Sequence, residues 1–404
     1  MAFEVRNLTI DEMEAAALIS AQAFGAPMRF DIAPTAERVR RLYPPEDYLG
    51  AFEDGELTAM THIVPRTFRI NGGSLGFGAV SPVASSSLHR RKGHAGALLR
   101  RSLEQMRERG HVLSGLYTPH PALYRRYGWE VAGGQRTYEF RPKDLQLSAE
   151  PSQRGRLRYV NVEDWPRLDA IHQRYAAVHN SPMDRDELWW REWVFRTWMG
   201  KVEGIVWQDN AGRDEGYLLY IDPVEPDPQK TQIYVFDFCA LTADAYLNMV
   251  TFLGQHDIRH HITFPAPLDD PLQLLFVDAE RLQIRERFSV MLRVIDVENA
   301  LRARPLADAS LSSELTMSIA DASAPWNAGT YRLRAEEGRI LVDRTEGEGE
   351  LSLDARVLAP MFNGYVTPSR AASAGMLRAG SEEALRRADA LFAVTKPPYF
   401  PDVY

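Results

Sequence analysis

The segment from Arg90 to Gly96 constrains the fold more than any other part of this sequence. It places small residues and three consecutive cations where a predicted strand over 75–85 gives way to a predicted helix that ends near Arg109. Small residues let a ligand approach the backbone, and a helix start offers unpaired N–H groups and the positive end of its dipole. The turn therefore predicts a site for an anion such as a pyrophosphate. Its residues are Arg90, Arg91, Lys92, Gly93, His94, Ala95 and Gly96.

The helix after this turn has one apolar face, formed by Leu98, Leu99, Leu103 and Met106, which we expect to be buried. Residues 88–110 hold seven Arg or Lys and two Glu, a net charge of +5 within a chain of net charge −8. A solvated helix face is an alternative explanation for part of this charge. The turn lacks the G-x-x-x-x-G-K-[ST] pattern of P-loops and the G-x-G-x-x-G pattern of dinucleotide-binding folds.

The composition is that of an ordinary globular protein, and 404 residues predict two or three domains. One cysteine, Cys239, cannot form an internal disulfide, which indicates a reducing compartment, and it is a poor basis for a structural metal site. The acidic balance argues against a protein that coats nucleic acid or membranes. No signal peptide or membrane-spanning apolar run is recognisable. We therefore expect a cytoplasmic protein without metal, nucleic-acid or membrane partners.

The order of predicted elements divides the chain into three parts, over residues 1–147, 148–286 and 287–404. Strands and helices alternate in the first part, and the second repeats this order without the cationic turn. In the third part, strands are followed by helices. This order predicts an α/β fold with an α+β final domain. The last nine residues, Lys396-Pro-Pro-Tyr-Phe-Pro-Asp-Val-Tyr404, contain three prolines and are expected to be extended.

A strand, the R-x-x-G-x-A turn, a helix, a second strand and a tyrosine-bearing helix resemble the GNAT superfamily of acyl-CoA-dependent N-acyltransferases. The resemblance implies that the amides of the turn hold the pyrophosphate of CoA. It also implies that the preceding strand, at Val83, Ala84 and Ser85, bonds the pantetheine arm through its backbone. Tyr124 is then the candidate general acid for the departing thiolate, since a phenol with a pKa near ~10 keeps its proton at pH 7.

Over its whole length the chain resembles the enhanced intracellular survival (Eis) acetyltransferases. The resemblance rests on Ala-Leu-Tyr-Arg-Arg-Tyr-Gly-Trp-Glu (122–130), on Pro-Ala-Pro-Leu-Asp-Asp-Pro (265–271), and on Pro-Trp-Asn-Ala-Gly (325–329). It implies tandem GNAT-like mixed-sheet domains, the second degenerate, followed by a sterol-carrier-protein-like domain. It further implies transfer of an acetyl group from acetyl-CoA to a primary amine, and a ring-like homo-oligomer such as a hexamer.

The same resemblance implies an unusual general base, the carboxylate at the C-terminus of the chain, which here belongs to Tyr404. Such a group has a pKa near ~3.5, so it is ionised at pH 7 and accepts a proton as the amine attacks. Phe24 and Asp402 are candidate contacts for the amine substrate. Aminoglycosides, polyamines, protein lysines and small amines all fit this description of the acceptor.

Several alternatives stay open at the level of sequence. Tyr124 could pack its helix without a chemical role, and Tyr404 could be a frayed terminus. The chain could be a tandem-GNAT aminoacyltransferase that uses tRNA, or a non-catalytic module that binds a lipid through its third domain. The four-residue spacing of His256 and His260 is weak support for a metal site, because no Glu follows His256.

Overall fold

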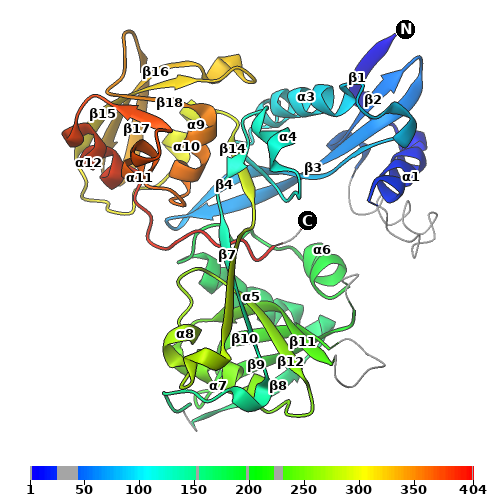
Figure 1. The fold of residues 1–404 in the computed structure, drawn as a ribbon, viewed down its shortest axis with the longest axis vertical. Coiled ribbons are helices and arrows are strands. Elements are labelled where there is room, and N and C mark those ends of the chain that lie inside the picture. The colour runs from blue at the N-terminus through cyan, green and yellow to red at the C-terminus, as the bar shows by residue number, and fades with distance from the viewer. Residues whose placement is uncertain (1, 25–43, 152–153, 197–199, 223–230, 403) are drawn as a thin grey trace. The chain divides into compact units, whose positions relative to one another are not determined.

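The computed structural model describes residues 2–24, 44–151, 154–196, 200–222, 231–402 and 404 (Figure 1). They form two compact units. The first comprises Met1–Ala132, Val290–Val394 and Tyr404, and the second comprises Gly133–Ser289 and Thr395–Val403. Two strands lie in a different unit from the neighbours that their predicted part gives them. β7 (Gly134–Phe140), within the predicted first part, lies in a sheet of the second unit. β14 (Met291–Val294), within the predicted third part, lies in the sheet of the first unit that contains β1 to β6. The three-domain division of the sequence stays a prediction.

The first unit contains a seven-stranded mixed sheet in the order β1-β2-β3-β4-β5-β14-β6. The strands not yet given are β1 (Phe3–Asn7), β2 (Tyr48–Glu53), β3 (Glu56–Ile70), β4 (Gly73–Ser85), β5 (Leu113–Leu116) and β6 (Glu130–Val131). Its helices are α1 (Met13–Ala23), α3 (His94–Glu108) and α4 (Pro121–Arg125). The predicted apolar face of α3 is confirmed, because all four of its residues are fully buried in the core beneath this sheet.

The first unit also contains a five-stranded sheet in the order β17-β16-β15-β18-β19. Its strands are β15 (Ser313–Ala320), β16 (Gly329–Glu336), β17 (Arg339–Thr345), β18 (Leu351–Asp354) and β19 (Leu377–Ala379). The helices of this part are α9 (Val297–Ala303), α10 (Ala355–Phe362), α11 (Pro368–Ser373) and α12 (Glu382–Leu391). The fully buried Arg304 joins the ends of α10 and α12 by donating to the carbonyls of Phe362 and Leu391 at 2.8 and 3.0 Å. Strands with helices beside them confirm the α+β prediction for this region.

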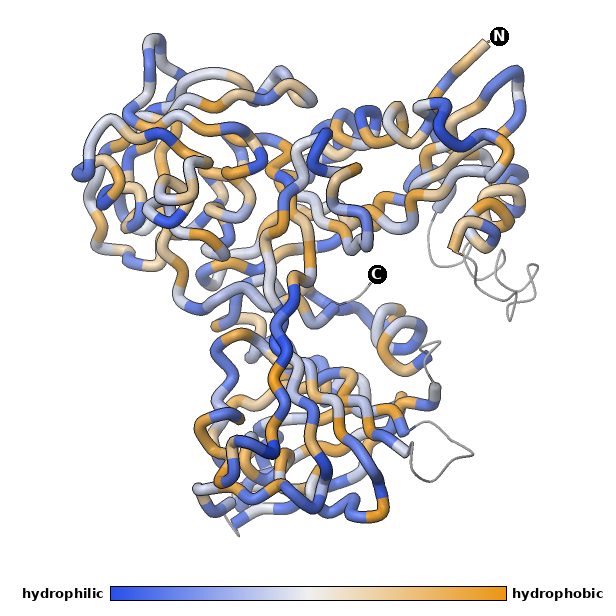
Figure 2. The backbone as a smooth tube through the Cα atoms, in the orientation of Figure 1, coloured by the Kyte–Doolittle hydropathy of each residue, from blue (hydrophilic) through white to orange (hydrophobic). Residues whose placement is uncertain are grey.

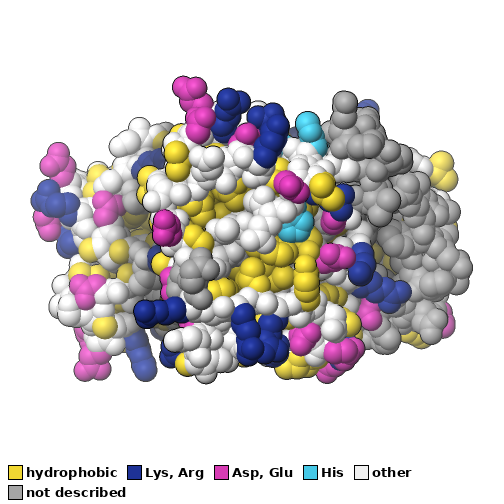
Figure 3. Space-filling model, turned by 90° about the horizontal axis from the view of Figure 1, so that it is seen from below, with side chains coloured by type: hydrophobic (Ala, Val, Ile, Leu, Met, Phe, Trp, Pro, Cys, Tyr) yellow, Lys and Arg dark blue, Asp and Glu magenta, His cyan; other side chains and the backbone are white. Residues whose placement is uncertain are grey.

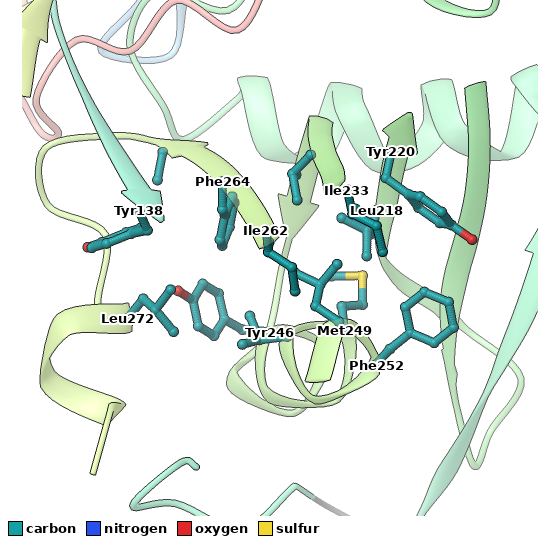
Figure 4. Packing of buried hydrophobic residues seen from close by; sticks show 14 of the residues in the cluster. Tyr138, Leu218, Tyr220, Ile233, Tyr246, Met249, Phe252, Ile262, Phe264 and Leu272 are labelled. Carbon is teal, nitrogen blue, oxygen red and sulfur yellow. The ribbon is translucent and has the colours of Figure 1, made fainter. Parts of the chain in front are cut away.

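The second unit has its own seven-stranded sheet, in the order β13-β7-β12-β11-β10-β9-β8. Its other strands are β8 (Gly155–Val160), β9 (Val202–Asp209), β10 (Asp214–Ile221), β11 (Gln232–Ala240), β12 (His261–Ala266) and β13 (Gln283–Phe288). Its helices are α5 (Trp165–Ala176), α6 (Glu187–Trp189), α7 (Ala243–Gly254) and α8 (Leu272–Leu275). Figure 4 shows the packing of Met249 and Tyr246 from α7 against Ile262 and Phe264 from β12.

Hydrophobic and hydrophilic residues are mixed along most of the chain (Figure 2). Within the described residues, no helix is long and apolar enough to cross a membrane.

Candidate functional site

The sheet of the first unit opens where β4 and β5 part. The two strands pair in parallel over Phe77↔Leu113, Gly78↔Ser114 and Ala79↔Gly115. Beyond Ala79, β4 runs on to Ser85 and stays paired only with β3 among the described strands. A register shift in the pairing with β3 lies between the partners of Thr61 and Ile63, so β4 has an extra residue at this point. The predicted pantetheine-binding residues Val83, Ala84 and Ser85 therefore lie on a strand end whose far side has no strand partner in the described structure.

The predicted anion-binding turn follows directly and leads into α3. Gly93 is the N-cap of α3, with a φ of 91°, and a β-carbon built there would have nothing within 4 Å. Arg91 also has a positive φ, 64°, which costs a non-glycine residue roughly 1–2 kcal/mol. Strained backbone of this kind is concentrated at binding sites. The open N-cap and the first N–H groups of α3 fit a pyrophosphate.

The side chains of the turn divide into exposed cations and an inward-facing histidine. Arg90 and Arg91 are exposed, and no carboxylate of the described residues lies within salt-bridge distance of either. Lys92 Nζ lies 2.6 Å from Glu53 Oε2. His94 is buried, and its Nδ1 lies 2.7 Å from the Thr58 hydroxyl. Burial lowers the pKa of His94, which disfavours a positive charge on its ring.

The two small residues at the start of α3 differ in the space around them. Ala95 is half-buried, whereas Gly96 is buried and a β-carbon there would lie 2.2 Å from the hydroxyl of Tyr127. Glycine at position 96 therefore lets the ring of Tyr127 reach the first turn of α3. The guanidinium of Arg100 lies 5.3 Å from the centre of the same ring.

Tyr124, the candidate general acid, lies on α4 and is 8% exposed. Its ring packs edge-on against Trp129, with 6.4 Å between ring centres. Burial raises the pKa of Tyr124, and a hydrogen bond with the Thr118 side chain offsets part of that rise. Thr118 Oγ1 also accepts the His120 N–H at 2.9 Å.

Tyr404 is ordered against β4 and β5. Ser81 Oγ donates to the main-chain oxygen of Tyr404 at 2.8 Å. The ring of Tyr404 lies 5.1 Å from that of Tyr117 and 6.4 Å from that of Phe77, measured between ring centres. A β-carbon at Gly115 would lie 2.9 Å from the Tyr404 hydroxyl, so the glycine makes room for the ring. These contacts place Tyr404 where the two strands part.

The two candidate substrate contacts differ in exposure. Phe24, the C-cap of α1, is 62% exposed. Asp402 is buried in the second unit, where its Oδ1 lies 2.7 Å from Arg185 Nε and its Oδ2 accepts the Met183 N–H at 3.2 Å. Both carboxylate oxygens are therefore engaged by the protein itself.

Three residues of this region were not predicted from the sequence: Ser81, Thr118 and Arg185. Ser81 and Thr118 hold the two candidate proton-transfer groups, and Arg185 pairs with both Asp402 and Asp237. None of them belongs to a recognisable sequence motif. Ser81 and Arg185 act through partners that are distant in the sequence, and the contact of Thr118 depends on the local path of the backbone. The residues of the cationic turn, by contrast, are consecutive, so the sequence alone is enough to recognise them.

Comparisons with known proteins agree with this geometry. Residues 4–132 and 181–294 match family models described as acetyltransferase (GNAT) domain, and residues 297–401 match the sterol carrier protein domain. The protein is a tandem GNAT protein with a sterol-carrier-type domain. The chain is 28% identical over 348 residues to an uncharacterized N-acetyltransferase of Streptomyces avermitilis, covering 83% of this chain and 84% of the relative. It is 24% identical over 345 residues to N-acetyltransferase Eis of Mycobacterium tuberculosis, covering 83% and 81% of the two chains.

A solved structure, that of Eis1 from Mycobacterium abscessus, superimposes with a TM-score of 0.83 at 26% identity, covering 99% of this chain and 100% of the other. The predicted resemblance to Eis acetyltransferases and the predicted fold class are confirmed. The tandem GNAT protein is an N-acyltransferase by family, as its sequence predicted.

Proposed function

We propose that this protein transfers an acetyl group from acetyl-CoA to a primary amine, with Tyr124 as general acid and the carboxylate at Tyr404 as general base. One observation carries the proposal. Tyr117 and Thr118, consecutive residues after β5, contact Tyr404 and Tyr124 respectively. This arrangement supports the proposal, because a phenol and a terminal carboxylate are suited to opposite proton transfers.

Acetyl-CoA would be held by the main chain of the first unit. The N-cap at Gly93 and the first amides of α3 would bind its pyrophosphate, and the unpaired side of Val83–Ser85 would bind its pantetheine arm. Arg90 and Arg91, which have no carboxylate partner among the described residues, would neutralise the phosphates. When bound, acetyl-CoA supplies an activated acyl group as its thioester.

The chemical step forms a bond from the amine nitrogen to the acyl carbon and breaks the bond from that carbon to sulfur. The carboxylate at Tyr404, held by Ser81, would take the proton that the nitrogen loses. Tyr124 would give its proton to the departing sulfur. Its raised pKa supports this role, because the phenol stays protonated at neutral pH.

Phe24 is proposed to line the path of the amine, since it is exposed at the end of α1. For Asp402 we propose an anchoring role in place of the substrate contact that the sequence suggested, because Arg185 and Met183 engage its carboxylate. The ring-like homo-oligomer stays a prediction, which sedimentation velocity would test. On the face shown in Figure 3, cations and carboxylates are interspersed, which gives no support to a tRNA-binding surface there.

The test is release of free CoA from acetyl-CoA with a panel of amines that includes aminoglycosides, polyamines and lysine peptides. Wild type is compared with Tyr124→Phe and with a chain extended by four residues after Tyr404. We expect turnover of at least one amine, and at least tenfold slower turnover in both variants, with the affinity for acetyl-CoA retained. Full activity in the extended chain would exclude the terminal base. Absence of acetyl-CoA binding would favour a non-catalytic module.

A further inference from the structure

The second unit repeats the parting of two parallel strands without the cationic turn. Its β11 and β12 pair in parallel over Gln232↔His261, Ile233↔Ile262 and Tyr234↔Thr263. Beyond these pairs, β11 runs on to Ala240 and β12 to Ala266. Only Leu241 and Thr242 separate β11 from α7, whereas residues 86–93 separate β4 from α3. The second unit therefore has the strand geometry of the first but no loop that could hold a pyrophosphate.

A cavity of about 140 Å³ lies where β11 and β12 part, entirely within the second unit. A cavity of about 150 Å³ accommodates a ligand the size of benzene. Five tyrosine and phenylalanine side chains contribute to the cavity wall. The aromatic residues are Tyr175, Phe238, Tyr246, Phe264 and Tyr399.

Two polar side chains of the wall are almost completely buried. Tyr175 is 7% exposed, and its hydroxyl has no hydrogen-bond partner among the described residues. Because Tyr175 lines the cavity, its hydroxyl can accept a hydrogen bond from a ligand there. Asp270 is 8% exposed, and its Oδ1 accepts the Tyr246 hydroxyl at 2.8 Å and the Leu272 N–H at 2.9 Å. These bonds fix the carboxylate at the cavity wall.

The charges around the cavity favour a cation. Asp269 and Asp270 contribute carboxylates and Lys396 one ammonium, which leaves one negative charge in excess. His179 adds no charge at neutral pH, because burial lowers its pKa. Burial raises the pKa of Asp270 to about 6, so this carboxyl is mostly ionised at pH 7. Aromatic faces next to a carboxylate are the usual surroundings of a bound organic cation.

We propose that this cavity is a second binding site, for a small protonated amine of about five heavy atoms. The ammonium donates to the Asp270 carboxylate and to the Tyr175 oxygen, and its alkyl part lies against the rings of Phe238 and Phe264. This site lies outside the catalytic region of the first unit, so it goes beyond the proposed function.

Occupancy of the cavity would order the segment 395–402. Lys396 and Tyr399 line the cavity, and both are tied to Asn180. Asn180 Nδ2 donates to the Lys396 carbonyl at 2.5 Å, and the Tyr399 N–H donates to the Asn180 carbonyl at 3.1 Å. A ligand that contacts both residues adds to these bonds, so it slows local opening of the segment.

The test uses n-butylammonium as the probe, the full chain, and no acetyl-CoA, so that no transfer occurs. Binding is measured by calorimetry, and hydrogen exchange of residues 395–402 is measured with and without the probe. We expect saturable binding and slower exchange of this segment in wild type. Tyr175→Phe and Asp270→Asn should each bind about tenfold more weakly or worse, because each loses a hydrogen bond to a charged group. Asp278→Asn, an exposed matched control, should bind as wild type does.

Two further arms separate this site from the catalytic region. Ala240→Leu fills the cavity and should abolish the protection of 395–402, whereas Tyr124→Phe should leave it intact. Uncharged 1-butanol should give no protection. Equal binding of n-butylammonium by wild type, Tyr175→Phe and Ala240→Leu would overturn the proposal, and so would binding without any change in the exchange of 395–402.

Discussion

Replacement of Ser81 by alanine tests the proposed base without changing the length of the chain. The Ser81 hydroxyl donates at 2.8 Å to the main-chain oxygen of Tyr404, and both residues are half-buried. A hydrogen bond to a charged group contributes about 1.5–3 kcal/mol, and partial exposure reduces this to about 1–2 kcal/mol. That free energy corresponds to a roughly 5- to 30-fold fall in the population of the correctly held carboxylate. We expect kcat to fall by a factor in this range.

The assay is steady-state release of CoA, with kcat and the KM for acetyl-CoA determined separately. Ser74→Ala serves as the control, because Ser74 is an exposed residue of the same strand. The KM for acetyl-CoA should not change in either variant, since Ser81 lies before the proposed pantetheine-binding residues. A kcat of Ser81→Ala equal to that of wild type would refute the argument that this hydroxyl holds the reacting group.

Three other substitutions probe the remaining parts of the site. Tyr124→Phe should lower kcat by about 10²–10⁴. Because burial raises the pKa of Tyr124 above that of a free phenol, wild-type activity should persist through the pH range in which a free phenol loses its proton, and a loss of activity at lower pH would contradict this assignment. Gly93→Ala must adopt a φ of 91°, which costs about 1–2 kcal/mol, so the variant should unfold at a lower temperature, and the dissociation constant of acetyl-CoA should rise because the N-cap amides shift to relieve the strain. Asp402→Asn breaks a buried ion pair at a cost of about 3 kcal/mol and should speed hydrogen exchange of residues 395–402; unchanged exchange would show that Arg185 does not anchor this segment. Burial alone would raise the pKa of Asp402, but the charge of Arg185 lowers it overall. The stability that the ion pair between Asp402 and Arg185 contributes should therefore be present above pH 4 and be lost as the pH falls further.

The elements with a local signature could be predicted from the sequence. Thr9 and Glu12 form a capping box, whose Thr-x-x-Glu pattern stands in the sequence, and the buried face of α3 follows its helical spacing. The turn at Gly93 was also predictable, because small residues and cations stand together there. These features depend on residues within a few positions of one another.

The pairings between distant segments could not be predicted in this way. The sequence around Arg185 carries no sign that its guanidinium is buried between Asp237 and Asp402. Similarly, the contact of Tyr404 with Ser81 joins residues 323 positions apart, and the family resemblance pointed to Tyr404 but not to Ser81. The pairing of β7 and β14 with distant strands could not be predicted for the same reason, since strand order depends on contacts across the whole chain.

The position of β14 in the sheet affects how the chain folds during its synthesis. This strand fills the position between β5 and β6, so the first sheet is incomplete until the ribosome has added residues 133–294. At a translation rate of roughly 5–20 residues per second, the nascent chain waits about ten to thirty seconds with the edges of β5 and β6 unpaired. Exposed edges of this kind invite association with other chains, so this interval is where a chaperone would be needed most.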